Sequence, residues 1–325
     1  MDESWLNEAG SLLGAGCPLP LDAPFTTAQA RDLGISRRAF EKLVRTGLLR
    51  CELRGVYAAA QAPNDPLMRA AALALVLPPD AVVVDRTAAW LHGVDALRRS
   101  AAHAPPPLDV IHLTDTRMNR PEVDGRRRGL IPADITTVHG VPVTTGLRTA
   151  LDCGRLLWRF DGLAVIDGFV RLGVPQELMV AELGRFKGFR GVIQLRYLVS
   201  IADGRAESGP ESALRLHWYD AGLGRPECQW WIYSDSGAPL FRIDIADPAA
   251  RYGAEYDGEQ FHTLDEDTEH DEERRDWLER HRGWKIDPFR KDPVFSKPGI
   301  VPELLQAGHA EAVRNISLWT PTRRT

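Results

Sequence analysis

Asp244 and Glu255, two acidic residues in the last third of the chain, have the types and the spacing that a divalent metal ion requires. Asp244 lies between Ile243 and Ile245 in a strand-forming segment, where a carboxylate has no structural reason to sit unless it faces a cleft or a cation. Glu255 lies eleven residues later on the next predicted strand, and paired strands can bring two carboxylates together, as a hard cation demands. Mg²⁺ or Mn²⁺ bound there would orient a water molecule and stabilise the charge on a phosphodiester in its transition state.

Three neighbouring residues add to this chemistry. Glu211, on the helix predicted before the strands, could supply a third oxygen ligand directly or through water, and Glu207, one turn earlier, is the weaker alternative. Asp257 and His262 flank the turn after Glu255, where a histidine could pass a proton to the attacking water or the leaving oxygen. The candidate catalytic residues are therefore Asp244, Glu255, Asp257, His262 and Glu211, and the metal ligands among them are Asp244 and Glu255.

A second group of residues has the charge to contact DNA phosphates. Between Phe25 and Tyr57 the chain carries seven basic and three acidic residues, although its net charge is -5. A local excess of Lys and Arg suits a phosphate backbone whatever the total charge. The predicted DNA contacts are Ser36, Arg37, Arg38, Lys42, Arg45 and Arg54.

Two short helices and a hairpin would position these contacts. Capping residues and turn signals predict, in order, a helix from Thr26 or Thr27, a turn at Gly34, a helix from Ser36 to about Thr46, and strands at 48–50 and 53–57. This order is typical of a winged helix-turn-helix, whose second helix enters the major groove of double-stranded DNA while the wing contacts the backbone. The alternative is a helical hairpin with an exposed basic face.

The carboxylates would be positioned by a separate carboxyl-terminal core. Apolar periodicity and turn residues predict, in order, a helix at 210–222, strands at 228–233, 241–245 and 252–256, a helix at 270–282 and a strand at 284–286. The three successive strands form an antiparallel meander because tight turns connect them. The predicted order is α-β-β-β-α-β.

The region between these two parts is predicted to be mixed α/β. It contains helices at 65–76 and 85–93, strands at 108–113 and 140–144, and a helix in which Arg148 and Asp152 form an ion pair. His92 is interpreted as a packed or capping residue. We therefore predict a multidomain α+β protein, with a winged helix-turn-helix at 20–62, a mixed α/β domain at 63–203 and the carboxyl-terminal core at 204–325.

Seven acidic residues and no basic residue lie between Asp265 and Glu273. These carboxylates would repel a phosphate backbone close to the candidate metal site. We interpret them as the solvated start of a helix, because acidic residues stabilise a helix amino terminus. The alternative is a docking surface for a basic partner.

Composition limits the cellular setting. The four cysteines are scattered, with no CxxC pair, so neither a zinc site nor a disulfide framework is indicated. The first ten residues have no basic signal-peptide region, and the longest apolar run, 70–77, is too short to span a bilayer. The expectation is a cytoplasmic protein with no membrane partner.

Two families resemble this chain. Glu211, the segments 242–248 and 255–262, Asp271 with Arg274 and Arg275, and Gly283 with Trp284 resemble the DUF559 group of Vsr-like proteins with a restriction-endonuclease fold. The upstream winged helix, with the segments 55–57, 87–93 and 143–149, resembles AbiEi-like antitoxins of type IV toxin-antitoxin systems.

The first resemblance implies a PD-(D/E)xK-like core in which Asp244 and Glu255 bind metal and Glu211 assists. Asp257 stands where that superfamily has lysine; the Vsr-like branch also lacks this lysine and relies on a histidine, which His262 matches. The leading hypothesis is a DNA-binding protein with an Mg²⁺-dependent endodeoxyribonuclease domain. The alternative is an AbiEi-like antitoxin that represses its own operon, keeps a non-catalytic nuclease fold and has a cognate toxin as partner.

Overall fold

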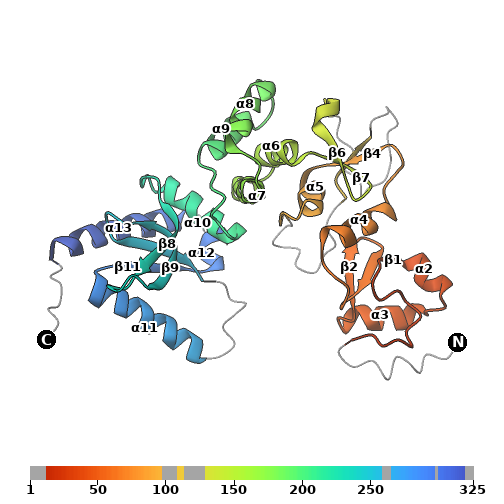
Figure 1. Ribbon diagram of the computed structural model, residues 1–325, viewed down its shortest axis with the longest axis horizontal. Helices are drawn as coiled ribbons and strands as arrows, with labels where there is room; N and C mark the ends of the chain where they lie inside the picture. Colours follow the sequence, from red (N-terminus) through yellow and green to blue (C-terminus); the bar gives the residue numbers. More distant parts are fainter. Residues whose placement is uncertain (1–11, 97–107, 113–128, 258–264, 297–298, 319–325) are drawn as a thin grey trace. The chain divides into compact units, whose positions relative to one another are not determined.

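The computed structural model describes residues 12–96, 108–112, 129–257, 265–296 and 299–318 (Figure 1). At 265–273, 292, 293 and 296 only the backbone is described. The described residues form a mixed α/β structure with three sheets, and the chain divides into two compact units, Met1–Cys153 and Gly154–Thr325. The division falls inside helix α6 (Gly146–Leu156), and the three domain ranges given above stay predictions.

The first unit begins with the predicted helices and hairpin. In order, the elements are β1 (Phe25–Thr26), α2 (Thr27–Asp32), α3 (Arg37–Arg45), β2 (Leu49–Leu53) and β3 (Val56–Ala59), and the three strands form an antiparallel sheet in the order β1-β3-β2. The Thr26 side chain caps α2 through a capping box with Gln29. The Ser36 hydroxyl accepts a 3.2 Å hydrogen bond from the Ala39 N–H at the start of α3. Phe25, Leu43 and Leu49 lie in the core beneath these elements.

The rest of the first unit is built on a four-stranded sheet in the order β5-β4-β7-β6, where β4 and β7 are parallel and the other pairs antiparallel. The strands are β4 (Ala81–Val83), β5 (Val110–His112), β6 (Ile135–Val138) and β7 (Val141–Thr144), and the helices are α4 (Pro66–Ala74), α5 (Asp85–Leu91), η2 (Pro132–Asp134) and α6. The predicted helices 65–76 and 85–93 and strand 140–144 are confirmed, with shorter bounds for the helices. Arg126, Arg127 and Arg128, a run of three basic residues in the sequence, lie outside the described residues.

The second unit begins with helices that the sequence analysis did not predict: α7 (Arg159–Arg171), α8 (Gln176–Glu182), η3 (Leu183–Phe186) and α9 (Val192–Ser200). A buried ion pair joins α7 to the next helix, α10 (Gly209–Asp220): Arg215 donates to the Asp167 carboxylate over 2.5 Å. The other Asp167 oxygen accepts the Asp203 N–H at 2.8 Å, so the buried carboxylate is hydrogen-bonded at both oxygens.

The predicted carboxyl-terminal order of elements is present. After α10 come β8 (Glu227–Tyr233), β9 (Pro239–Asp247), β10 (Tyr252–Tyr256), α11 (Asp265–Arg282) and β11 (Lys285–Phe289), followed by α12 (Lys291–Ser296) and α13 (Ile300–Leu318). The sheet order is β11-β10-β9-β8; β8, β9 and β10 are antiparallel, and β11 is parallel to β10. The helix predicted at 270–282 begins at Asp265 instead, because the acidic run forms its amino-terminal half, where carboxylates favour the helix dipole.

Helices cover both faces of this sheet (Figure 1). Trp277 and Leu278 of α11 pack against Ile243 of β9 on one face. On the other face, Trp218 of α10 stacks on Tyr252 of β10 with ring centroids 5.4 Å apart. No helix among the described residues is both long and apolar enough to cross a membrane.

Candidate functional site

The carboxylates predicted from the sequence lie on three elements of the second unit. Asp244 is in β9, Glu255 in β10 and Glu211 in the first turn of α10. The register pairs Ala254 with Ile245, so Asp244 and Glu255 lie on adjacent strands next to this pair. The predicted strands are thus the ones that bring the two carboxylates near each other.

Asp244 has a raised pKa. Burial raises its pKa to about 7, and the negative charges of Glu211 and Glu255 act in the same direction. The Tyr256 N–H donates a 2.8 Å hydrogen bond to the Asp244 carboxylate and, with the Gln229 side chain, opposes the rise. Asp244 therefore exchanges a proton near neutral pH, as a group in general acid-base chemistry does.

Glu211 is held by protein donors. Its carboxylate accepts hydrogen bonds from the Glu207 N–H at 2.9 Å, the Ser208 hydroxyl at 2.7 Å and the Gln229 amide at 2.8 Å. Ser208 is also the N-cap of α10, so the helix start fixes the Glu211 side chain in place. Both carboxylate oxygens of Glu211 thus accept hydrogen bonds from protein groups.

Glu255 forms an ion pair with Arg274 of α11. The two side chains are only 15% and 25% exposed, so water screens their charges weakly. The Arg274 guanidinium also lies 5.4 Å from the centre of the Phe241 ring, a cation–π contact. Glu255 is therefore paired with an arginine in this structure.

Gln229 is a residue that the sequence analysis missed. It lies within β8 with φ at +54°, a left-handed conformation that costs a non-glycine residue energy. The pairs Cys228–Ile245 and Trp230–Ile243 flank it, which places it across from Asp244. Its amide oxygen is buried without a hydrogen-bond partner among the described residues. The only sequence signal was an amide between the apolar residues Cys228 and Trp230.

The remaining predicted residues of this group form other contacts or lie outside the described chain. Asp257 contacts Arg290 at 3.4 Å, and its N–H donates to the Phe289 carbonyl. Glu207 forms a two-pronged ion pair with Arg242, at 2.8 and 2.9 Å. His262 lies outside the described residues, so its role stays a prediction.

The donor atoms suit Mg²⁺ or Mn²⁺, because every candidate ligand is a carboxylate oxygen. Their arrangement does not fit a bound ion. Arg274 already neutralises Glu255, and protein donors occupy Glu211. Within the described part of the chain, no group of three or more Asp, Glu, His or Cys side chains is arranged to hold a metal. The site is ion-paired, and a metal centred on Asp244 and Glu255 stays a proposal.

The basic residues of α3 are exposed along one side of the helix. Arg38, Lys42 and Arg45 recur at the helical spacing i, i+4, i+7 and are exposed, whereas Ala39 and Leu43 are buried on another side of the helix. Among the described residues, these three basic side chains form no ion pair or hydrogen bond. Their charges are therefore available to a ligand.

The other predicted DNA contacts have different surroundings. Arg37 pairs with Glu41 at 2.8 Å, and both side chains are well exposed. Arg54 is exposed at the turn between β2 and β3, which Gly55 makes with φ at +81°. Arg50, a nearby basic residue that was not among the predicted DNA contacts, pairs with the buried Glu52 and donates to backbone carbonyls, so it stabilises the hairpin.

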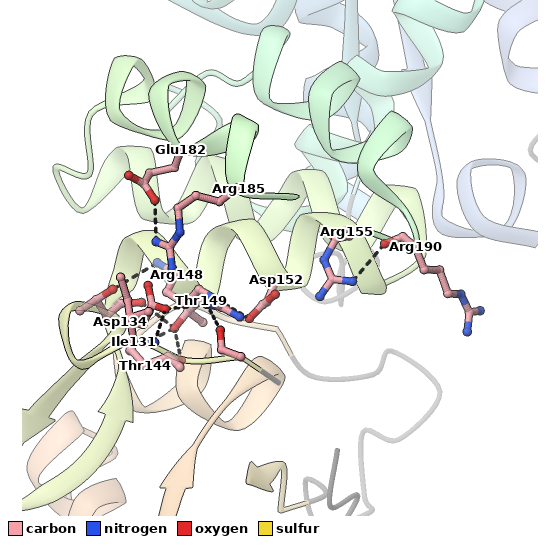
Figure 2. A network of polar contacts seen from close by, with 12 residues as sticks. Ile131, Asp134, Thr144, Arg148, Thr149, Asp152, Arg155, Glu182, Arg185 and Arg190 are labelled. Carbon is pink, nitrogen blue, oxygen red and sulfur yellow. Dashed lines mark hydrogen bonds and ion pairs between the residues drawn. The ribbon is translucent and has the colours of Figure 1, made fainter. Parts of the chain in front are cut away.

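A buried polar network in the first unit surrounds Arg148. Figure 2 shows this side chain between Asp134 and Asp152, each at 2.7 Å. The predicted pair with Asp152 is therefore confirmed, and Asp134 is a partner that the sequence did not indicate. His92 contacts the Thr144 carbonyl at 2.8 Å, and burial lowers the pKa of its imidazole, as expected for a packed histidine.

Known proteins match this chain in two ways. Residues 80–201, from the start of β4 to the end of α9, match the family model of the AbiEi antitoxin C-terminal domain. Two Mycobacterium tuberculosis proteins, one from strain H37Rv and one from strain CDC 1551, are each 34% identical to this chain over 267 residues. These alignments cover 82% of this chain and 94% of each relative, and both relatives are named as uncharacterized.

Proposed function

The chain belongs to the same family as these two mycobacterial proteins and contains an AbiEi antitoxin C-terminal domain, and we propose that it is a DNA-binding antitoxin that represses its own operon. The antitoxin domain match carries this proposal. An antitoxin implies a cognate toxin, whose activity in the cell this chain would counteract.

The exposed face of α3 supports the DNA-binding half of the proposal. Arg38, Lys42 and Arg45 present three charges on one side of a helix whose start is fixed by the Ser36 cap. A helix of this kind followed by a basic hairpin is the arrangement that reads a major groove and its phosphates. The ion-paired state of the carboxyl-terminal carboxylates supports a domain that works without catalysis.

The test uses a reporter gene under the control of the chain's own upstream region. Wild type should repress the reporter, and the variant with Arg38→Ala, Lys42→Ala and Arg45→Ala should relieve repression at least tenfold, because three phosphate contacts are lost. A control with Arg225→Ala, Arg280→Ala and Lys291→Ala also removes three positive charges, but from the second unit. This control should repress the reporter as well as wild type does. Equal repression by both triple variants would contradict the proposal.

The toxin half is tested separately. Expression of a toxic neighbouring gene from a plasmid with a foreign inducible promoter should stop growth. Co-expression of this chain from a second plasmid should restore growth. The triple α3 variant should restore growth equally well when both genes are driven by foreign promoters, because repression then plays no part. No rescue by any variant of the chain would exclude an antitoxin for that toxin.

Endonuclease activity is the second candidate, and the proximity of Asp244 to two further carboxylates favours it. It would require Arg274 to leave Glu255. Nicking of duplex DNA in Mn²⁺ by wild type, lost in Asp244→Ala with DNA binding retained, would support it. The absence of nicking on any DNA would exclude it.

A further inference from the structure

Residues 183–200 in the second unit contain four basic residues and no acidic residue. The segment comprises η3, a tight loop and α9. Gly188 and Gly191 make the loop with φ values of +82° and +79°. Gly191 also lies so close to the Arg155 carbonyl that no side chain would fit, so the loop geometry requires glycine there.

This loop and helix expose three large apolar side chains in a row. Phe189, Ile193 and Tyr197 recur every four residues and are 50%, 81% and 39% exposed. Ile193 and Tyr197 lie on one side of α9 because they are four residues apart in the helix, and Phe189 lies in the loop that leads into it. Lys187, Arg190 and Arg196 are exposed beside them. We call these six residues the α9 platform.

Each exposed aromatic ring of the platform has an arginine against it. The Arg155 guanidinium lies 5.6 Å from the centre of the Phe189 ring, and the Arg159 guanidinium lies 6.0 Å from that of Tyr197. Arg155 is held by a 3.0 Å hydrogen bond to the Arg190 carbonyl (Figure 2). Two arginine–aromatic pairs thus flank Ile193.

We propose that the α9 platform binds single-stranded nucleic acid. Exposed aromatic rings can stack unpaired bases, and the exposed Lys187, Arg190 and Arg196 can neutralise the adjacent phosphates, whereas Arg159 is already paired with Asp220 at 2.7 Å. Arg185 of this segment pairs with Glu182, but the charges of Lys187, Arg190 and Arg196 suit a polyanion, and the exposed Ile193 offers an apolar contact to a base. Paired bases present no free ring face, so the platform selects single strands. This site is separate from α3 and does not depend on the proposed repression.

The experiment measures the binding of a fluorescein-labelled oligouridylate of about 20 nucleotides to the full chain by anisotropy, at several salt concentrations. Wild type should bind with an affinity that falls as salt rises. Phe189→Ala with Tyr197→Ala should weaken binding at least tenfold, and Arg190→Ala with Arg196→Ala should weaken binding and reduce its salt dependence.

Two controls separate the platform from the rest of the surface. Leu172→Ala with Leu178→Ala removes two side chains of similar exposure, 56% and 51%, and should leave binding unchanged. The triple α3 variant should also bind normally. The proposal is overturned if wild type does not bind, if the aromatic double variant binds as well as wild type with unchanged melting, or if the α3 variant loses binding. Binding of polyglutamate in place of the oligonucleotide would assign the platform to an acidic protein.

Discussion

The chemistry of Asp244 is set by its neighbours and by its burial. A carboxyl between two apolar strand residues loses its hydration, and two further carboxylates lie near it. Hydrogen bonds from the Tyr256 N–H and the Gln229 side chain stabilise the charged carboxylate, but they only partly offset the effect of burial on its pKa. The consequence is a dependence of stability on pH that a single substitution can reveal.

Asp244→Asn should remove part of the pH dependence of stability. The folded pKa is raised to about 7, whereas an unfolded aspartate titrates near 4, so the folded chain alone keeps the proton between these values. Wild-type stability should therefore fall as pH rises from about 4 to 7, by at most about 1.4 kcal/mol per pH unit, and then level off. Urea unfolding of both proteins from pH 5 to pH 8 checks this. If the difference in unfolding free energy between wild type and Asp244→Asn does not change with pH, Asp244 titrates normally.

The pair of Arg274 and Glu255 gives a second prediction for single residues. Arg274→Met leaves the largely buried Glu255 carboxylate without its cation and should cost about 1–3 kcal/mol of unfolding free energy. Glu255→Gln in the same chain should restore much of this loss, because the unpaired charge is gone. A double-mutant cycle by urea unfolding measures the coupling. Additive effects of the two substitutions would mean that the ion pair does not form in solution.

At the scale of elements, local rules predicted those parts of the chain whose signals are local. Ser36 and Gly34 define the start of α3 and the turn before it, and both act as predicted. The strands around Asp244 were predicted from the alternation of apolar and polar residues and from the turn residues between the strands. Local signals failed where packing decides, as in α7, whose buried Phe160, Leu163 and Ile166 face partners that are distant in sequence.

The candidate site was predicted in part for the same reason. Carboxylates within strands are visible in a sequence, whereas their partners depend on register and on helix position. Arg274 reaches Glu255 only because α11 covers that part of the sheet, and Gln229 lies across from Asp244 only because β8 pairs with β9. The ion-paired character of the site therefore could not be read from spacing.

Ser36→Ala tests the role of one element, α3. The Ser36 hydroxyl satisfies an N–H that would otherwise be unpaired, so its loss should cost about 1 kcal/mol of stability and weaken DNA binding because the helix start frays. Ser36→Asp keeps an acceptor at the cap and should retain stability. Thermal melts and DNA titrations measure the two effects. A fully stable alanine variant would show that the cap contributes nothing to α3.

At the scale of the whole molecule, charge is distributed unevenly. The net charge is -5, yet α3 presents three basic residues on one side, and the acidic run at 265–273 lies in the other unit. Net charge therefore says little about the proposed DNA binding, which would depend on the local potential of the first unit.

The most direct test of the central claim is the salt dependence of binding to the chain's own upstream DNA, measured by anisotropy with duplex DNA. Wild type should lose affinity steeply as salt rises, and Arg38→Ala with Lys42→Ala and Arg45→Ala should reduce the logarithmic slope by about one per lost phosphate contact. The control with Arg225→Ala, Arg280→Ala and Lys291→Ala should match wild type. An α3 variant with wild-type affinity and slope would contradict DNA binding through this helix.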